Sequence, residues 1–322
     1  MQVDFTVAIR TYNGENYLPE LLDRLRSQVN ADDLHWEIVI VDNNSKDNTA
    51  KIIREYQARW DRHYPLKYYL ETQQGAAFAR KRCFEEAKSS LIGFLDDDNL
   101  PDPNWVAAAY AFGLAHPKAG AYSGKILGEF ETDPPKDFNK IAVFLALIER
   151  GKKPFRYSET KHKVLPPGAG LVIRKEAWYE SLPQQLLLSG PQGKALSAKG
   201  EDLEILSHLE NADWEIWYAP EIQIYHKIPS WRMERDYLIS FVGKSGLTRH
   251  HIRMLRLKPW QRPLAFFAYL ANDAKRVVWH FFKYYKVLNT DTVAACKMAL
   301  LYSILISPFH MMRLHLSKKR VQ

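Results

Sequence analysis

Three consecutive aspartates mark the most unusual chemical position in the sequence. Asp96, Asp97 and Asp98 follow an apolar run in the stretch FLDDDNLPDPNW, residues 94–105. Like charges repel, and folding alone gives no reason to place them where a hydrophobic segment ends. Hard cations such as Mg²⁺ and Mn²⁺ take oxygen ligands, which a substrate diphosphate often completes. The motif therefore predicts a D-x-D clamp for a metal-bound diphosphate, formed by Asp96 and Asp98; the alternative is a solvated acidic turn.

A second pair of acids could supply a general base. Glu201 and Asp202 follow a glycine and open a predicted helix in GEDLEILSHL, residues 200–209. One of these carboxylates could take a proton from an attacking hydroxyl. Acidic residues are also common in the first turn of an ordinary helix, where the helix dipole favours them. On the residues alone, the catalytic and the structural interpretation are equally supported.

His226 and Asp42 each follow a predicted strand, and each has two interpretations. The imidazole of His226 could complete a metal shell, although a lone histidine after a strand is more often only hydrogen-bonded. The Asp42 carboxylate could accept a hydrogen bond from a nucleobase or a ribose hydroxyl. It could instead form an Asx turn, because two asparagines and a serine follow it.

A glycine and an arginine in QQGAAFARKR, residues 73–82, could bind phosphate. Gly75 stands at the mouth of a predicted helix, where an open N-terminus would offer backbone N–H groups to an anion. The guanidinium of Arg80 could reach the same anion. The alternative is a solvated basic helix face, which carries more weight for Lys81 and Arg82 than for Arg80.

The elements that must position these residues alternate between two periodicities over the first 115 residues. Predicted strands cover residues 5–9, 37–42, 66–71 and 91–96, and predicted helices cover 14–28, 47–60 and 76–88. This alternation predicts βαβ units in a mostly parallel, Rossmann-like α/β sheet flanked by helices. Ligands bind such sheets beyond the carboxyl ends of the strands. The polar residues that follow the strands should therefore gather at one edge.

Later segments are less regular. The sequence predicts a strand at 121–127, a helix at 137–151, a turn, strand and helix at 166–178, and two short strands around Pro220 within 215–226. Most tryptophans are expected in the core. Trp105 and Trp231 are the two that could stack on a sugar.

The composition is that of a globular protein, with 46% hydrophobic and 25% charged residues in a chain of 322. This length allows one large or two ordinary domains. Cys83 and Cys296 suggest no disulfide framework or metal cluster, and we predict buried thiols in a reducing compartment. The N-terminus lacks the basic and apolar regions of a signal peptide, so we expect a protein made in the cytosol.

Charge is distributed unevenly along the chain. Residues 226–322 contain 18 Lys and Arg against 4 Asp and Glu, whereas residues 1–225 contain 27 against 33. The tail implies an anionic partner, and no RNA-binding or zinc-finger pattern supports nucleic acid. Residues 262–285 have the spacing of a basic amphipathic helix, and the apolar residues 293–312 are just long enough to span a bilayer. We expect a membrane surface to bind residues 262–312; packing within the protein or a dimer interface is the alternative.

Taken in order, these motifs resemble the inverting nucleotide-sugar glycosyltransferases of family 2, which have the GT-A fold. The stretches that carry the resemblance are IRTYNGENYLPELLDRL, EIVIVDNNSKDNT, GAAFARKR, FLDDDNLP, PPGAGLVIRKEAW and GEDLEI. The pattern is similar to enzymes of bacterial exopolysaccharide assembly, including hormogonium polysaccharide glycosyltransferases. The resemblance implies a GT-A catalytic domain over residues 1–230 and a basic, aromatic-rich helical tail, associated with a membrane, over residues 231–322.

The resemblance gives the candidate residues separate roles. Those on the nucleotide-sugar side are Thr11, Tyr12, Asn13, Asp42, Gly75, Arg80, Asp96 and Asp97. Those implied to hold Mn²⁺ or Mg²⁺ are Asp98, Asp96 and His226. Asp202 would be the base with Glu201 beside it. Gly168, Gly170 and Trp231 would border the acceptor, because glycines let a sugar approach the backbone.

The implied reaction is inverting transfer of a single sugar from a nucleotide-sugar, with a UDP-sugar favoured, to a saccharide or lipid-linked saccharide. Processive members carry a QxxRW motif after the base, whereas this chain has SWRMERDY at residues 230–237. Polymer extrusion is therefore not expected. The enzyme would lie on the inner face of the plasma membrane as a peripheral or monotopic protein.

Two other functional classes remain open at this point. A sugar-nucleotide nucleotidyltransferase would typically need a glycine-rich loop after the first strand, where this chain has only Gly14. A non-catalytic membrane- or sugar-binding module would be indifferent to the loss of Asp98 or Asp202.

Overall fold

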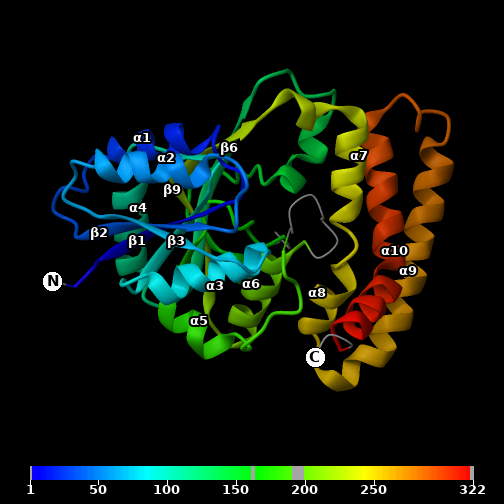
Figure 1. The fold of residues 1–322 in the computed structure, drawn as a ribbon. Coiled ribbons are helices and arrows are strands. Elements are labelled where there is room, and N and C mark those ends of the chain that lie inside the picture. Colours follow the sequence, from blue (N-terminus) through cyan, green and yellow to red (C-terminus); the bar gives the residue numbers. More distant parts are fainter. Residues whose placement is uncertain (1, 161–163, 191–198, 320–322) are drawn as a thin grey trace. The chain divides into compact units, whose positions relative to one another are not determined.

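The computed structural model describes residues 2–160, 164–190 and 199–319, which form two compact units (Figure 1). Among these residues, the first unit comprises 2–129, 146–160, 164–190 and 201–227, and the second comprises 130–145, 199–200 and 228–319. The division into a catalytic domain and a membrane-associated tail stays a prediction about what these parts do.

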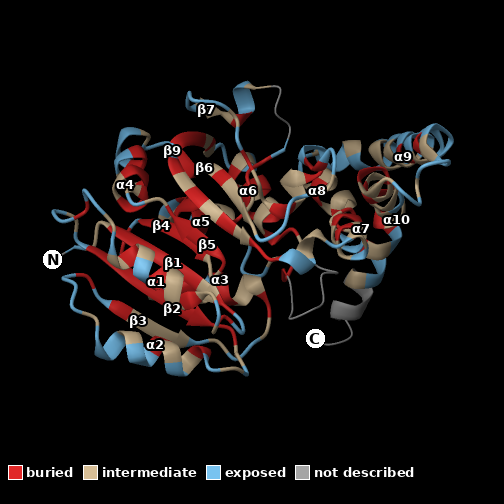
Figure 2. Cartoon of the chain, turned by 90° about the horizontal axis from the view of Figure 1, so that it is seen from above, coloured by how far each residue is buried: buried red, intermediate tan, exposed pale blue. Residues whose placement is uncertain are grey.

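The parallel half of the sheet has the strand order β3-β2-β1-β4. These strands are β1 (Phe5–Thr11), β2 (Trp36–Asp42), β3 (Leu66–Leu70) and β4 (Leu91–Asp96). All seven residues of β2 are buried (Figure 2), as expected for a parallel strand that helices cover on both faces. The four predicted strands and their parallel arrangement are confirmed.

An antiparallel half continues the same sheet in the order β8-β6-β9-β5 beyond β4, and β7 pairs with β9. These strands are β5 (Asn99–Pro101), β6 (Ala119–Phe130), β7 (Phe155–Arg156), β8 (Val172–Arg174) and β9 (Glu215–Ile228). Only a short turn separates β4 from β5, yet β5 pairs with β9. This crossing brings the acidic turn after β4 against the end of β9.

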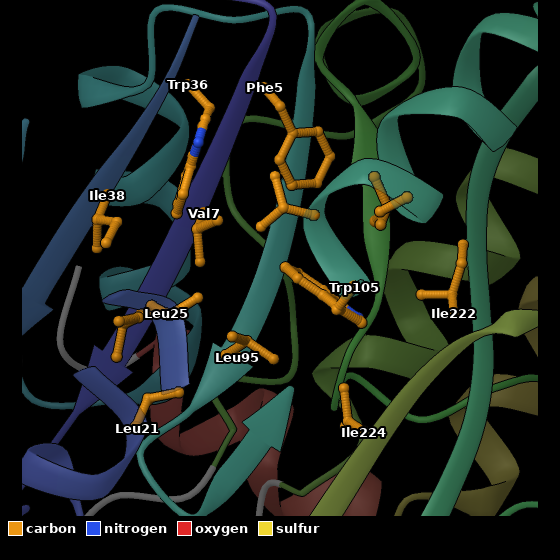
Figure 3. Close-up of a cluster of buried hydrophobic side chains, with 14 of the residues drawn as sticks. Phe5, Val7, Leu21, Leu25, Trp36, Ile38, Leu95, Trp105, Ile222 and Ile224 are labelled. Atoms are coloured by element: carbon orange, nitrogen blue, oxygen red, sulfur yellow. The ribbon is translucent and has the colours of Figure 1, made fainter. Parts of the chain in front are cut away.

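Helices cover both faces of the sheet in the first unit. They are α1 (Leu18–Arg26), α2 (Thr49–Ala58), α3 (Ala76–Glu86), α4 (Trp105–Ala115), α5 (Lys175–Ser181) and α6 (Glu201–Asn211). Val7 and Ile9 of β1 pack in one core cluster with α1, α2 and α4 (Figure 3). Ala8 points the other way and packs with α3, α5 and α6, because successive strand residues face opposite sides.

Three sequence-based expectations are wrong. Residues 137–151 form two short 3₁₀ turns instead of a helix, because Asp137 and Ala146 have left-handed φ angles of 64° and 62°. Residues 215–226 lie in one strand, β9, rather than two. Gly124 of β6 permits a close approach of that strand, since a Cβ there would lie 1.8 Å from the Ile222 carbonyl oxygen. Trp105 is fully buried in the core and cannot stack on a sugar.

The second unit is built from helices around a long C-terminal one. They are α7 (Arg235–Lys244), α8 (Arg249–Leu255), α9 (Arg262–Tyr284) and α10 (Thr292–Lys319). Helix α10 packs against the other three, and Figure 1 shows it between α7 and α9. Within the described chain, residues Thr292–Leu314 are the one helical stretch long and apolar enough to cross a membrane, and 44% of an apolar 18-residue window within it is buried inside the protein. The predicted helical extension is confirmed.

Candidate active site

The carboxyl ends of three neighbouring parallel strands lie side by side. The register pairs Thr11 of β1 with Asp42 of β2, and Arg10 of β1 with Asp96 of β4. Polar and charged residues that follow separate apolar runs in the sequence therefore meet at one edge. This is the edge where α/β sheets bind ligands, at the point where the strand order reverses.

Asp42 is buried and uses both of its carboxylate oxygens within the protein. Oδ1 accepts a hydrogen bond from the backbone N–H of Ser45 at 2.8 Å, and Oδ2 accepts one from the Tyr68 hydroxyl at 3.0 Å. Burial and the Asp42 charge raise the pKa of Tyr68 to about 12. Asp42 therefore anchors the loop that follows it, through the N–H three residues on rather than the N–H two residues on that defines an Asx turn. A contact between Asp42 and a nucleoside stays a prediction.

The loop after β1 is fastened to the loop after β2. Asn13 adopts a left-handed φ of 56°; its N–H donates to Ser45 Oγ at 2.9 Å and its Oδ1 accepts the Lys46 N–H at 2.8 Å. The Tyr12 side chain is exposed between these anchored residues. Thr11, Tyr12 and Asn13 thus lie together at the predicted nucleotide edge, with Tyr12 presenting an open aromatic ring.

The three aspartates that end β4 each have a different partner. Asp96 Oδ1 accepts a hydrogen bond from Arg10 Nη2 at 2.5 Å, and Asp97 Oδ2 accepts one from Thr11 Oγ1 at 2.7 Å. Asp98 Oδ2 lies 3.3 Å from Nε2 of His226. Strand β4 ends at Asp96 and the chain then turns. The positions of the carboxylates are therefore set by these partners and not by the alternation of side chains along a strand.

Asp98 and His226 are brought together by strand pairing. Asn99 of β5 pairs with His226 of β9, and both Asp98 and His226 are buried. Burial and the charge of Asp98 raise the pKa of Asp97 to about 7, so the turn concentrates negative charge in a place poor in water. An oxygen and a nitrogen donor beside excess negative charge fit a divalent cation.

The fit to a metal is limited to these two side chains. No cluster of three or more His, Cys, Asp or Glu suited to a metal occurs among the residues that the structure describes. Asp96, the third predicted ligand, is engaged by Arg10. A cation held by Asp98 and His226 would therefore take its other ligands from substrate oxygens and water.

Arg10 connects the acidic turn with the second acidic pair. Its Nη1 lies 3.6 Å from Glu201 Oε1, while its Nη2 bonds Asp96. Burial lowers the pKa of Arg10, but the neighbouring charges of Asp96 and Glu201 raise it above the usual value. The guanidinium therefore stays charged and links the end of β4 to the start of α6.

Arg80 on α3 is a buried cation whose polar atoms are not satisfied within the protein. It is fully buried, and none of its three guanidinium nitrogens has a hydrogen-bond partner among the described residues. The group lies over the Phe94 ring at 5.2 Å. Burial and the nearby Arg10 charge lower the pKa of Arg80 to about 10. A buried charge without hydrogen bonds is costly, so this guanidinium is well suited to receive an anionic ligand.

The acids at the start of α6 differ in their surroundings. Asp202 Oδ2 accepts the backbone N–H of Gly168 at 2.8 Å, and Oδ1 accepts that of Leu203 at 2.8 Å. Glu201 is buried, and burial together with the Asp202 charge raises its pKa. The predicted base is thus held by the loop that was predicted to border the acceptor.

Two glycines occur in that loop, and a different structural constraint explains each of them. A Cβ on Gly168 would lie 2.5 Å from Arg80 Nη2, and Gly170 has a left-handed φ of 62° with Ile224 packed against it. Trp231, the third predicted acceptor residue, belongs to the second unit, where its half-exposed side chain contacts Tyr237. An acceptor role for these three residues stays a prediction.

The N-terminus of α3 is closed, contrary to the open helix end expected at Gly75. The Gly75 N–H donates to Asn43 Oδ1 at 2.8 Å, and the Ala77 N–H donates to the Ser189 carbonyl at 3.0 Å. Gly75 itself has a φ of 141°, which only glycine adopts readily. The turn explains why a glycine stands here, and contacts of Gly75 and Arg80 with a nucleotide-sugar stay predictions.

Sequence reasoning missed Arg10, Asn43 and Tyr68. Arg10 had a signal in the sequence. It is the one charged residue of β1, and it stands at the sheet edge where the aspartates were expected. Asn43 holds the loop before α3 by donating to the carbonyls of Glu71 and Gln73. Its role had no signal, because its partners lie about 30 residues away along the chain.

Comparisons with known proteins agree with this geometry. Residues 6–179 match the family described as Glycosyl transferase family 2. The putative teichuronic acid biosynthesis glycosyltransferase TuaG of Bacillus subtilis is 34% identical over 94 residues, 29% of this chain and 35% of TuaG. The undecaprenyl-phosphate 4-deoxy-4-formamido-L-arabinose transferase of Shewanella sediminis is 38% identical over 112 residues, 33% of this chain and 34% of that protein. The chain thus matches about a third of the length of these relatives.

Solved structures share the fold at low sequence identity. The mannosyltransferase PcManGT from Pyrobaculum calidifontis, in complex with GDP-Man and Mn²⁺, has a TM-score of 0.60 at 20% identity and covers 96% of this chain and 88% of its own. Staphylococcus aureus TarS, in complex with UDP-GlcNAc, has a TM-score of 0.53 at 16% identity and covers 100% and 93%. These likenesses establish the fold, a mostly parallel GT-A sheet with flanking helices.

Proposed function

The chain belongs to glycosyl transferase family 2, and we propose that it transfers one sugar from a nucleotide-sugar to a saccharide or lipid-linked saccharide with inversion of configuration. One observation carries this proposal. Arg10 joins Asp96, on the predicted donor side, to Glu201, the neighbour of the predicted base Asp202. A buried ionic link between the two acidic motifs would hold donor and acceptor chemistry in one place.

The donor is proposed to bind at the carboxyl ends of β1, β2 and β4. Thr11, Tyr12, Asn13 and Asp42 would surround the nucleoside, with the exposed Tyr12 ring free to stack on the base. We favour a UDP-sugar on the sequence resemblance. Among the similar folds, TarS was solved with UDP-GlcNAc and PcManGT with GDP-Man, so the fold alone does not select the base.

Two cationic elements would receive the diphosphate. The Arg80 guanidinium, which lacks partners within the described protein, would donate hydrogen bonds to its oxygens. Asp98 and His226 would hold Mn²⁺ or Mg²⁺ beside it. When bound, such a cation neutralises the charge that develops on the departing diphosphate.

Asp202 is proposed as the general base. Two backbone N–H groups hold its carboxylate at a fixed orientation, which would keep it aimed at an acceptor hydroxyl. The acceptor hydroxyl would pass its proton to Asp202, its oxygen would bond to the anomeric carbon, and the bond from that carbon to the diphosphate would break on the opposite face. Glu201 would position Arg10 rather than take the proton.

The setting is proposed to be bacterial envelope or exopolysaccharide assembly at the inner face of the plasma membrane. Among the similar proteins, TuaG is named for teichuronic acid biosynthesis and the arabinose transferase for undecaprenyl-phosphate. A lipid-linked acceptor would give the basic helical tail a reason to contact a membrane. Transfer of a single sugar, rather than processive synthesis, is proposed because the QxxRW motif is missing after the base.

The decisive experiment separates donor binding from transfer. The wild-type protein should melt at a higher temperature with a UDP-sugar plus Mn²⁺, since a ligand that binds only the folded state stabilises it. Asp202→Asn should keep this shift and lose transfer to a saccharide acceptor by at least about a hundredfold.

Asp33→Asn is the matched control, because Asp33 is exposed on the surface of the same unit, and it should retain full transfer. Full transfer by Asp202→Asn would remove Asp202 from the role of base. Release of pyrophosphate from a nucleoside triphosphate and a sugar phosphate would instead identify a nucleotidyltransferase. No selective response to any nucleotide-sugar would favour a binding module.

A further inference from the structure

The outer face of α9 carries a continuous apolar strip in the second unit. Each of its large side chains is more than half exposed, and the exposed fraction reaches 74% at the first. The strip consists of Leu264, Phe267, Val278, Phe282 and Tyr285. Spacings of three, four and seven residues or their sums keep these side chains on one side of a helix. Exposed aromatic residues in such a row usually mark an interaction surface.

The opposite side of α9 is already used inside the unit. Asp273 and His280 are buried there, and His280 Nε2 lies 2.9 Å from the Ala294 carbonyl oxygen of α10. The two sides of α9 therefore have different tasks, one packing against α10 and one facing outward.

Basic residues flank the apolar strip and have no exposed carboxylates among them. The segment 249–290 contains nine Lys and Arg and a single acid, Asp273. That acid is buried and paired with Arg253. Lys275, Lys283 and Lys286 are exposed on the outer side. A surface that combines aromatic and positive side chains in this way matches an anionic bilayer surface.

Helix α8 adds arginines on the inner side of α9, around the buried Asp273. Arg253 of α8 and Arg276 of α9 both lie within 4 Å of Asp273. Burial and the positive charges of Arg253, Arg256 and Arg276 lower the pKa of Arg249. These positive groups lie behind the outer face and add to the attraction of the unit for an anionic surface.

Helix α10 is the one described element with the composition of a membrane span, yet its contacts tie it to the helical unit. A Cβ on Gly246 would lie 2.8 Å from the Leu300 carbonyl oxygen, so the backbones pack closely there. Ser307 Oγ donates to the Leu247 carbonyl and accepts the His250 N–H, both at 2.8 Å. Crossing a bilayer would break these bonds and expose the faces of α7 and α8 that α10 now covers.

We propose that the outer face of α9 binds the phosphate headgroups of anionic phospholipids at a membrane surface, with the arginines of α8 adding positive charge behind it, and that α10 remains packed in the protein instead of crossing the bilayer. This deepens the proposed function in one respect, since it rests on the membrane contact included there and names the surface and the lipid class. It does not depend on the transfer reaction.

The test is flotation of the full-length protein with vesicles. Wild type should float with vesicles of phosphatidylcholine mixed with phosphatidylglycerol at low salt, and much less with phosphatidylcholine alone or at high salt. Lys275→Gln, Lys283→Gln and Lys286→Gln combined should weaken binding on the order of a hundredfold. Phe267→Ser with Phe282→Ser should abolish flotation.

A matched control replaces three exposed lysines of the first unit, Lys51, Lys81 and Lys118, by glutamine; it should float like wild type. Equal losses in this control would show attraction by net charge alone and overturn the assignment to α9. Protein that stays with the vesicles after an alkaline carbonate wash would show an embedded span and overturn the role given to α10.

Two further outcomes would also overturn the proposal. Wild-type dimers that become monomers in the Phe267→Ser, Phe282→Ser variant, without a change in flotation, would make the face a contact between two copies. Unchanged flotation with a loss of RNA binding in the lysine variant would make it a nucleic-acid surface. Transfer to a water-soluble acceptor, measured on the same variants, should be unchanged; if no transfer occurs in wild type while flotation follows the predictions, the proposed activity fails and the lipid surface stands.

Discussion

Charge is organised differently in the two units of this protein. At the edge of the sheet, charged groups are partly or wholly buried and have specific partners, as Arg10 has in Asp96 and Glu201 and Asp97 has in Thr11. On the outer face of α9, exposed lysines stand beside aromatic rings without a carboxylate among them. Buried pairs depend on geometry at the scale of a hydrogen bond, whereas exposed like charges act together through a field that salt screens. The first arrangement suits a reaction, and the second suits a broad surface.

The largest expected effect comes from breaking the ionic link through Arg10. Arg10→Met should reduce the free energy of unfolding by about 3 kcal/mol, because it leaves the buried Glu201 carboxylate without its cation, while Asp96, which is 39% exposed, remains partly hydrated. Urea denaturation measures this. Arg26→Met, which breaks the exposed pair with Asp61, is the matched control and should cost less than about 1 kcal/mol. Similar losses in both variants would contradict the contrast between the units.

A smaller loss is expected where the two loops meet at the acidic turn. Gly14→Ala would place a Cβ 2.2 Å from Thr11 Oγ1 and 2.6 Å from Asp97 Oδ2. One or both side chains must move, so the Thr11–Asp97 hydrogen bond should break at a cost of about 1–3 kcal/mol in unfolding free energy. Donor affinity, measured by calorimetry, should fall as well. A variant with wild-type stability and affinity would show that this bond does not organise the site.

A change of opposite sign is expected at Arg80. In the folded protein the pKa of the Arg80 guanidinium lies below its usual value, which means that folding disfavours its charged form. Because Arg80 is charged throughout the neutral range, its burial lowers the stability of the unliganded protein there. Arg80→Met should therefore raise the free energy of unfolding by about 1 kcal/mol while it weakens donor binding. Calorimetry with and without a UDP-sugar measures both effects.

Arg82→Met is the control on the same helix, where Arg82 forms a partly exposed pair with Glu86, and it should change neither quantity by much. A destabilised Arg80→Met that still binds the donor would show that Arg80 serves folding alone.

The smallest effect on stability is expected on the outer face of α9. Lys283→Gln should change the free energy of unfolding by less than about 0.5 kcal/mol, because the ammonium group is exposed and lies only against the rings of Trp279 and Tyr284. Thermal denaturation measures this change. A loss as large as that at Arg10 would mean that Lys283 stabilises the fold and does not serve only as part of an interaction surface.

The sequence predicted the parallel half of the sheet well because β1, β2 and β4 are buried along nearly their whole length and therefore appear as continuous apolar runs. The buried state of the thiols Cys83 and Cys296 was predicted correctly too. The helix expected at 137–151 failed because its apolar spacing does not reveal the left-handed backbone at Asp137.

The contacts between residues of the candidate site were harder to predict from the sequence than the identities of those residues. The ion pair of Arg10 and Asp96 follows from the parallel register of β1 and β4, which no local pattern encodes. The approach of Asp98 to His226 needs β5 to cross to β9, a long-range pairing of three residues. The residue types at the edge could be listed from sequence, whereas their contacts required the topology.

The bond between Asp202 and residue 168 has a consequence for how the enzyme could acquire new acceptors. Its donor is a peptide N–H, which every amino acid except proline supplies. The side chains that flank position 168 can therefore diversify without depriving the carboxylate of that donor, although position 168 itself must stay small beside Arg80. A library at residue 167, which is less buried than residues 165, 166 and 169, would thus test whether this loop sets acceptor preference while the bond to Asp202 is kept.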